Sequence, residues 1–169
     1  MPAGVRTEPR SSAQGKFAEA VRLFERASLL RPEDFQAPSF LAQAYAGLGK
    51  RADSVAANRR GLKLTEERIE LNPDDARAYN LAAALLASLG ETDRALDYAR
   101  RAAALDPDDP MTLYNVSCTY AVLGKGEEAL NCLESALDKG YGHKDWIEHD
   151  PDFDSLREHP RYKAILDAM

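Results

Sequence analysis

The sequence repeats itself with a period close to 34 residues, and this period constrains the fold more than any other feature. Gly15, Gly49, Gly90 and Gly124 are separated by 34, 41 and 34 residues. Two further series keep the last two intervals: Pro32, Pro73 and Pro107, and Tyr45, Leu86 and Tyr120. A 34-residue period predicts an all-α fold of stacked antiparallel helix pairs. Arrays of this kind present surfaces more often than reactive groups, so we do not expect an enzyme.

Composition restricts the choice of partner. The 169 residues include 28 acidic and 22 basic residues, a net charge of −6, which argues against a nucleic-acid surface built from clustered Lys and Arg. The longest apolar run, residues 81–87, is far shorter than the ~18 residues of a membrane span, and the N-terminus carries no signal-peptide pattern. We therefore expect a cytoplasmic chain, although a piece of a longer protein could lack its targeting signal.

The two cysteines, Cys118 and Cys132, fit the apolar packing positions of one repeat. A reduced compartment is the default interpretation, and a disulfide or a reactive thiol is the alternative.

The unit from Asp74 to Pro107 shows the repeat most clearly. Asp74 or Asp75 can cap a first helix, and Gly90 can end it because glycine tolerates positive φ. A second helix is expected over Thr92–Leu105, and it ends where Asp106 precedes a proline.

This pattern resembles the tetratricopeptide repeat (TPR) family. The residues that carry the resemblance are the turn glycines, the terminal prolines, the Tyr45, Leu86 and Tyr120 series, and the small pairs Ala42, Ala83 and Ser117 with Ala95 and Ala129. The resemblance implies a right-handed α-solenoid of antiparallel helix pairs. It divides residues 15–140 into a half repeat (15–32) and three repeats (35–73, 76–107 and 110–140).

The interval between Gly49 and Gly90 is seven residues longer than the other glycine intervals. Since seven residues are close to two helical turns, the insertion between Gly49 and Gly90 predicts a second helix of about 21 residues over Arg51–Leu71.

The array begins with half a repeat. Lys16–Leu30 has the pattern of a second helix, whereas residues 1–14 lack a helical apolar stripe and contain Pro9, so we expect an irregular segment or linker there. Either the chain is cut from a longer protein, which we favour, or another molecule covers this edge.

Residues 141–169 lose the period but stay rich in apolar residues, so we expect helices that cap the last repeat. Trp146 and Phe153 are the candidates for its open face, and His159-Pro160 predicts a helix start. The stretch 145–162, with the long helix, also resembles the tails of TPR arrays in bacterial multidomain signalling proteins that carry cyclase, kinase or winged-helix domains. That resemblance implies a signalling context.

No catalytic or metal site is expected. Asp150, Asp152 and Asp154 alternate as in a calcium loop, but Ser155 and Arg161 stand where glycine and glutamate are needed. The three histidines lie within the tail at spacings of six and ten residues, wider than zinc pairs. The sequence predicts no cofactor.

The TPR resemblance places the binding surface on the first helices. The expected groove residues mix amides with apolar side chains, as suits an extended peptide or a docked helix: Gln36, Phe40, Gln43, Arg77, Asn80, Leu81, Ala84, Met111, Tyr114, Asn115 and Cys118. The alternative is that Phe40, Leu81 and Tyr114 pack between repeats. Asn115 matches one residue of the clamp that holds chaperone tails, but Ser39, Gln43, Asn80 and Ala84 do not supply its other residues.

We therefore expect a scaffold that binds a protein segment in its concave groove and regulates a larger signalling protein. The alternative is a homo-oligomerisation module, in which the unpaired helix edge near Phe17, Val21 and Phe24 joins two copies.

Overall fold

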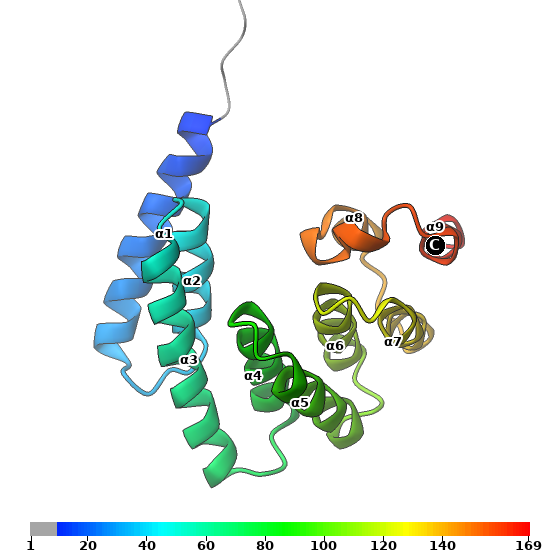
Figure 1. Ribbon diagram of the computed structural model, residues 1–169, viewed down its shortest axis with the longest axis horizontal. Coiled ribbons are helices and arrows are strands. Elements are labelled where there is room, and N and C mark those ends of the chain that lie inside the picture. The colour runs from blue at the N-terminus through cyan, green and yellow to red at the C-terminus, as the bar shows by residue number, and fades with distance from the viewer. Residues whose placement is uncertain (1–9) are drawn as a thin grey trace, which may run out of the picture. The chain divides into compact units, whose positions relative to one another are not determined.

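The fold is all-α, as the repeat predicts. The computed structural model describes residues 10–169, which contain no β-strand (Figure 1). The α-helices are α1 (Arg10–Leu30), α2 (Ala37–Gly47), α3 (Arg51–Leu71), α4 (Ala76–Ser88), α5 (Thr92–Leu105), α6 (Pro110–Val122), α7 (Gly126–Asp138), α8 (Lys144–His149) and α9 (Pro160–Asp167), and a 3₁₀ helix, η1 (Pro151–Leu156), follows α8. The chain forms two compact units, residues 1–64 and 65–169, joined within α3.

In the first unit, α1 packs against α2. Its core consists of small and medium apolar residues, namely Val21, Leu41, Ala42, Ala44 and Ala57. At its edge, the ring of Phe24 stacks on that of Phe40 with centroids 5.3 Å apart. The ring of Phe17 covers Gly47 so closely that a Cβ there would lie 2.6 Å from it.

The start of α1 differs from the prediction. The helix begins at Arg10, so residues 10–14 are helical, whereas we expected them to be irregular. No proline follows Pro9 in this stretch, so nothing in residues 10–14 opposes helix formation. The remaining residues of the predicted linker, 1–9, lie outside the described part of the chain.

The second unit contains two complete helix pairs, α4–α5 and α6–α7, with α5 packed on α6. Asp75 caps α4 as predicted, since it accepts a hydrogen bond from Ala78 N, and Asp109 caps α6 in the same way by accepting one from Thr112 N. Where the two helices of a pair cross, Ser117 Oγ donates to the carbonyl oxygen of Ala129 at 2.8 Å.

The turn glycines follow the prediction with one exception. Gly49, Gly90 and Gly124 have φ values of 73°, 79° and 71°, which few other residues adopt. Gly15, the first glycine of the series, lies inside α1 instead. The prediction of a 21-residue helix over Arg51–Leu71 is confirmed by α3, which has these bounds.

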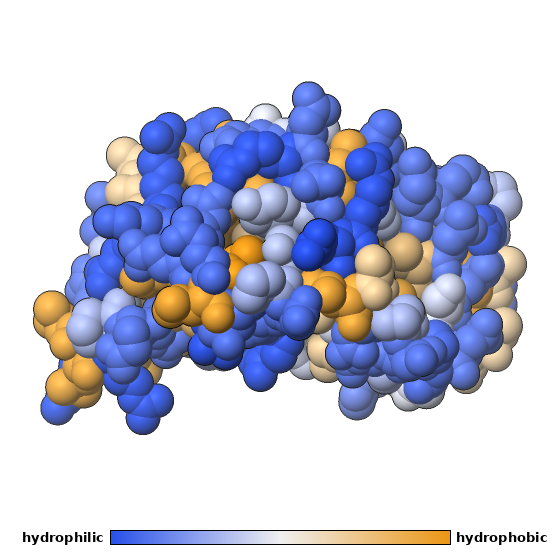
Figure 2. Space-filling view, turned by 90° about the horizontal axis from the view of Figure 1, so that it is seen from below, coloured by the Kyte–Doolittle hydropathy of each residue, from blue (hydrophilic) through white to orange (hydrophobic). Residues whose placement is uncertain are grey.

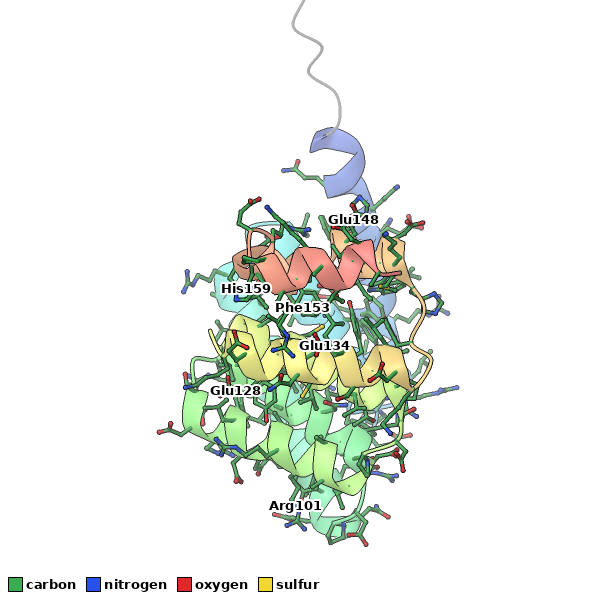
Figure 3. The ribbon with its side chains drawn as sticks, turned by 90° about the vertical axis from the view of Figure 1, so that its right-hand side faces the viewer. Arg101, Glu128, Glu134, Glu148, Phe153 and His159 are labelled. Atoms are coloured by element: carbon green, nitrogen blue, oxygen red, sulfur yellow. The ribbon has the colours of Figure 1, made fainter. Side chains whose placement is uncertain are left out.

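Residues 141–169 cover the last helix pair, with η1 packed on α6 and α9 packed on α7. Phe153 is fully buried, as predicted, and its ring stacks on that of Tyr162 at 5.5 Å. Figure 3 shows it between α9 and α7. The prediction for Trp146 is wrong, because its side chain is 66% exposed. The helical turn of α8 directs its neighbour Ile147 inward instead, and Ile147 is fully buried.

Arg161 of α9 joins this helix to α7 through four hydrogen bonds. The guanidinium of Arg161 donates to both carboxylate oxygens of Glu134, at 3.0 and 2.6 Å, and also to Glu127 and Asn131. The predicted start of this helix is confirmed, since Pro160 is its first residue and His159 Nδ1 accepts a hydrogen bond from Arg161 N.

Candidate functional site

The inner positions of α4 and α6 form the part of the expected groove that remains open in the second unit. Arg77, Ala84 and Asn115 are exposed, Leu81 is half-buried, and Met111 is 51% exposed. These side chains lie on adjacent helices, because α4 contacts α6. The surface thus combines three apolar side chains with an amide and a guanidinium. On the face that Figure 2 shows, hydrophobic side chains gather in separate patches among hydrophilic ones.

Asn80 lies beneath this surface and holds the two helices together. It is buried, and its Nδ2 donates to the carbonyl oxygen of Thr112 on α6 at 3.3 Å. Its Oδ1 is also buried and accepts no hydrogen bond. A buried acceptor without a donor costs about 1–3 kcal/mol, so this amide is a place where a donor would stabilise the protein.

Tyr114 and Cys118, two further expected groove residues, lie under the C-terminal segment. Tyr114 is 3% exposed; its ring stacks on Tyr141 with centroids 4.2 Å apart, and its Oη donates to Asp150 Oδ2 at 2.6 Å. Cys118 Sγ contacts the same carboxylate oxygen at 3.8 Å. These two side chains of the last repeat therefore contact the C-terminal segment, residues 141–169.

The tail brings a thiol and two carboxylates together. One ligand atom each from Cys118, Asp150 and Asp152 lie within 4.8 Å of one another, a spacing that could hold a metal ion. Burial and the nearby carboxylates raise the pKa of the Cys118 thiol far above its usual value, so the thiol keeps its proton. Burial and the charge of Asp150 raise the pKa of Asp152 to about 6.

No sequence pattern indicated this cluster. Cys118 stands 32 residues before Asp150. The alternation of Asp150, Asp152 and Asp154 also fits helix-capping carboxylates, and Asp150 acts in this way, since its Oδ1 accepts a hydrogen bond from Asp152 N at 2.9 Å.

In the first unit, the expected groove residues lie on or just before α2. Gln43 is exposed, Gln36 is half-buried, and Phe40 is 46% exposed beside Phe24. These residues stand at repeat positions equivalent to those of Arg77, Leu81 and Ala84.

The expected association edge of α1 faces α2 and is not open as we expected. Val21 and Phe24 pack with the first core, and Phe17 covers Gly47 of α2. The most exposed large apolar side chains of α1 are instead Leu23, Leu29 and Leu30, at 61%, 83% and 72%, whereas Phe17 is 37% exposed. Among residues 10–169, no helix is both long and apolar enough to cross a membrane.

This chain belongs to the tetratricopeptide repeat family. The family model matches residues 12–68 and 41–110, which together span more than half of the chain. Helix pairs, turn glycines and small crossing residues therefore have the arrangement that the family shares. Proteins of this fold act in general as scaffolds for protein interactions and not as enzymes.

Known proteins resemble parts of the chain. A chloroplast protein of Arabidopsis thaliana is 38% identical over 53 residues, which is 31% of this chain and 16% of that protein. The matched part of this chain therefore spans about a sixth of the length of that relative. A MamA double mutant superposes with a TM-score of 0.51 at 17% identity, over 90% of this chain and 82% of its own.

A further structure is that of YrrB, described as a TPR protein with an unusual peptide-binding site. It is 20% identical, with a TM-score of 0.43, over 78% of this chain and 82% of its own.

Proposed function

We propose that this chain binds an extended segment or a helix of a partner protein on the inner surface of its first helices. The observation that supports this most is the open surface of α4 and α6. Met111 is 51% exposed there, next to the exposed Asn115 and the half-buried Leu81. An exposed methionine adapts its shape to different partners, and an amide can pair with a peptide backbone.

Asn80 favours a ligand that carries a hydrogen-bond donor. Its buried Oδ1 lacks a donor. We propose that this side chain rotates on ligand binding, so that a backbone N–H of the ligand donates to Oδ1. A ligand that supplied this donor would recover part of the free energy that the unpaired acceptor costs.

Tyr114 and Cys118 do not belong to the proposed surface, because they already contact Asp150 and Tyr141 of the C-terminal segment. The proposed ligand therefore contacts α4 and the exposed residues of α6. Gln36, Phe40 and Gln43 stand at the equivalent positions of the first unit, and we propose them as a second surface of the same kind.

The wider context is also a proposal. The resemblance of the tail to arrays in signalling proteins supports a regulatory module of a larger cytoplasmic protein, bacterial in origin. The net charge of −6 supports a protein ligand over a nucleic acid.

A displayed library of random linear peptides tests the proposal. Peptides selected on the native chain are measured by calorimetry against Met111→Glu and against Ala104→Glu, which places the same charge on an exposed position of α5. We expect Met111→Glu to weaken binding by about tenfold or more and Ala104→Glu to leave it unchanged. Equal affinities for both variants would contradict a site on α4 and α6.

A further inference from the structure

Two carboxylates of the C-terminal segment lie beside the inner positions of α6. Asp150 Oδ2 accepts hydrogen bonds from Tyr114 Oη at 2.6 Å and from Cys118 Sγ at 3.8 Å. A carboxylate oxygen of Asp152 lies within 4.8 Å of Cys118 Sγ and of a carboxylate oxygen of Asp150. Asp150 is half-buried, whereas Asp152 is exposed. These two residues, the carboxylate pair, are therefore within reach of a ligand on the inner surface.

Within residues 10–169, no Lys, Arg or His side chain forms an ion pair with either member of the carboxylate pair. Arg157 donates to the backbone carbonyl oxygen of Asp150 at 3.1 Å, but its carboxylate partner is Asp154, at 2.7 Å. Two like charges this close together repel each other, and a cation beside them is attracted by both. The carboxylate pair is therefore a place for a positive charge that the described residues do not supply.

The open surface of α4 and α6 extends up to the carboxylate pair. Asn115 stands three residues before Cys118, so the two side chains are neighbours on one face of α6, and Asn115 is exposed. Ala84 stands at the position of α4 that is equivalent to Cys118, and it is also exposed. A ligand segment that contacts Asn115 and Ala84 therefore passes beside Asp152.

The same surface contains a buried polar atom that has no partner. Asn80 is 7% exposed, and its Oδ1 accepts no hydrogen bond, although its Nδ2 joins α4 to α6. A buried acceptor of this kind points, independently of the carboxylates, to a ligand that supplies a donor. Both places on this surface thus offer acceptors, so the ligand that fits them is rich in hydrogen-bond donors.

We propose that the partner segment carries a lysine or arginine side chain that binds the carboxylate pair, while an apolar side chain of the same extended segment contacts Met111. This pairing rests on the function proposed above, because it requires a segment on α4 and α6. Met111 and Cys118 are seven residues apart, which is about 10 Å along α6. Since an extended chain covers about 3.3 Å per residue, we expect the basic residue about three positions from the apolar one.

The Cys118 thiol favours a side-chain cation over a metal ion at this place. A metal ion binds the thiolate, not the thiol. Cys118 is only 8% exposed, and its thiol contacts the carboxylate of Asp150 as a donor. A lysine or arginine side chain needs the two carboxylates alone and carries donors for both, so the thiol stays neutral.

Peptides selected from the displayed library test this chemistry. We expect those that Met111→Ala weakens to contain Lys or Arg about three positions from an apolar residue. Calorimetry of one such peptide, with EDTA present and above the pKa of Asp152 of about 6, compares Asp152→Asn with Asp97→Asn. The second variant removes the same charge from an exposed position of α5. Asp152→Asn should weaken binding by about three- to fivefold, and Asp97→Asn should leave it unchanged.

A peptide with glutamine in place of its basic residue completes a double-mutant cycle. If the charges pair, this peptide binds the native chain and Asp152→Asn with nearly equal affinity.

Two results would overturn the pairing alone and leave the groove in place. One is a set of Met111-dependent peptides without basic residues, and the other is equal affinity of the basic peptide for Asp152→Asn and Asp97→Asn. Zn²⁺ binding that Cys118→Ser abolishes, together with such equal affinities, would assign the carboxylate pair to a metal ion instead. A library without binders, or peptides insensitive to Met111→Ala, would overturn the groove and the pairing together.

Discussion

The two ends of the repeat array differ in how their last helices are covered. At the C-terminal end, residues 141–169 fold over α6 and α7, so that Ile147 and Phe153 are fully buried and Tyr162 is 1% exposed. At the N-terminal end, Leu23 and Leu30 of α1 remain mostly exposed. One end therefore supplies its own cap, whereas the described residues supply none at the other.

The difference shows that a repeat position alone does not determine burial. Tyr98 and Leu23 occupy equivalent positions, but only Tyr98 has a first helix to contact among the described residues. In a solenoid each helix pair is stabilised by its neighbours, so a helix at an open end lacks the contacts of one neighbour. The stability of the chain should accordingly be concentrated toward the C-terminal end.

The largest expected loss of stability comes from a substitution in the C-terminal cap, residues 141–169. Phe153→Ala should lower the free energy of unfolding by about 3–5 kcal/mol, because it leaves a cavity between the rings of Tyr114 and Tyr162. Chemical denaturation of residues 1–169 measures this loss.

Trp146→Ala serves as its control on the same cap. Its side chain is 66% exposed, and surface changes of this kind alter stability by less than about 0.5 kcal/mol. If Trp146→Ala cost as much as Phe153→Ala, the cap would not be folded as described.

A pair of equivalent positions tests the comparison directly. Tyr98→Ala should cost about 1–3 kcal/mol, since it removes a half-buried ring and its edge-on contact with Tyr79. Leu23→Ala should cost less than about 0.5 kcal/mol, because the Leu23 side chain is 61% exposed. Thermal unfolding of both variants at low micromolar concentration provides the measurement, and similar losses would show that Leu23 is covered within a single chain.

Much of the fold could be predicted because the repeat is a local pattern. The positions of the turn glycines, the cap at Asp75 and the bounds of α3 and α5 all follow from spacing, capping residues and helical periodicity. The error at residues 10–14 came from the same reasoning, since the absence of an apolar stripe does not prevent a helix from continuing.

The details of the candidate site were harder to predict because they depend on the tail. Tyr114 and Cys118 have inner positions in the repeat, but their neighbour Asp150 lies more than 30 residues away in a segment without the period. Trp146 and Ile147 are adjacent, so a rotation of α8 by about 100° decides which of them is buried. Sequence periodicity indicates the register of long helices better than that of a six-residue helix.

The smallest effect concerns an acidic side chain of the cap, Asp152. Since burial and the neighbouring Asp150 raise the pKa of Asp152 to about 6, the folded state binds a proton there more tightly than the unfolded state does. This group therefore stabilises the fold most below about pH 4, and its contribution falls as the pH rises from about 4 to 6. Stability near pH 7 should be lower than it would be with a neutral side chain at this position.

Asp152→Asn should accordingly raise the free energy of unfolding at pH 7 and flatten its slope between about pH 4 and 6. We expect a gain of about 1 kcal/mol or less, because part of the side chain remains in water. Asp145→Asn, which removes the same charge from an exposed position of α8, should leave the slope unchanged. Denaturation curves at several pH values measure both variants. A slope that persisted in Asp152→Asn would mean that the closed end is not stabilised by protonation of its own cap, and the contrast with the open end would then rest on apolar packing alone.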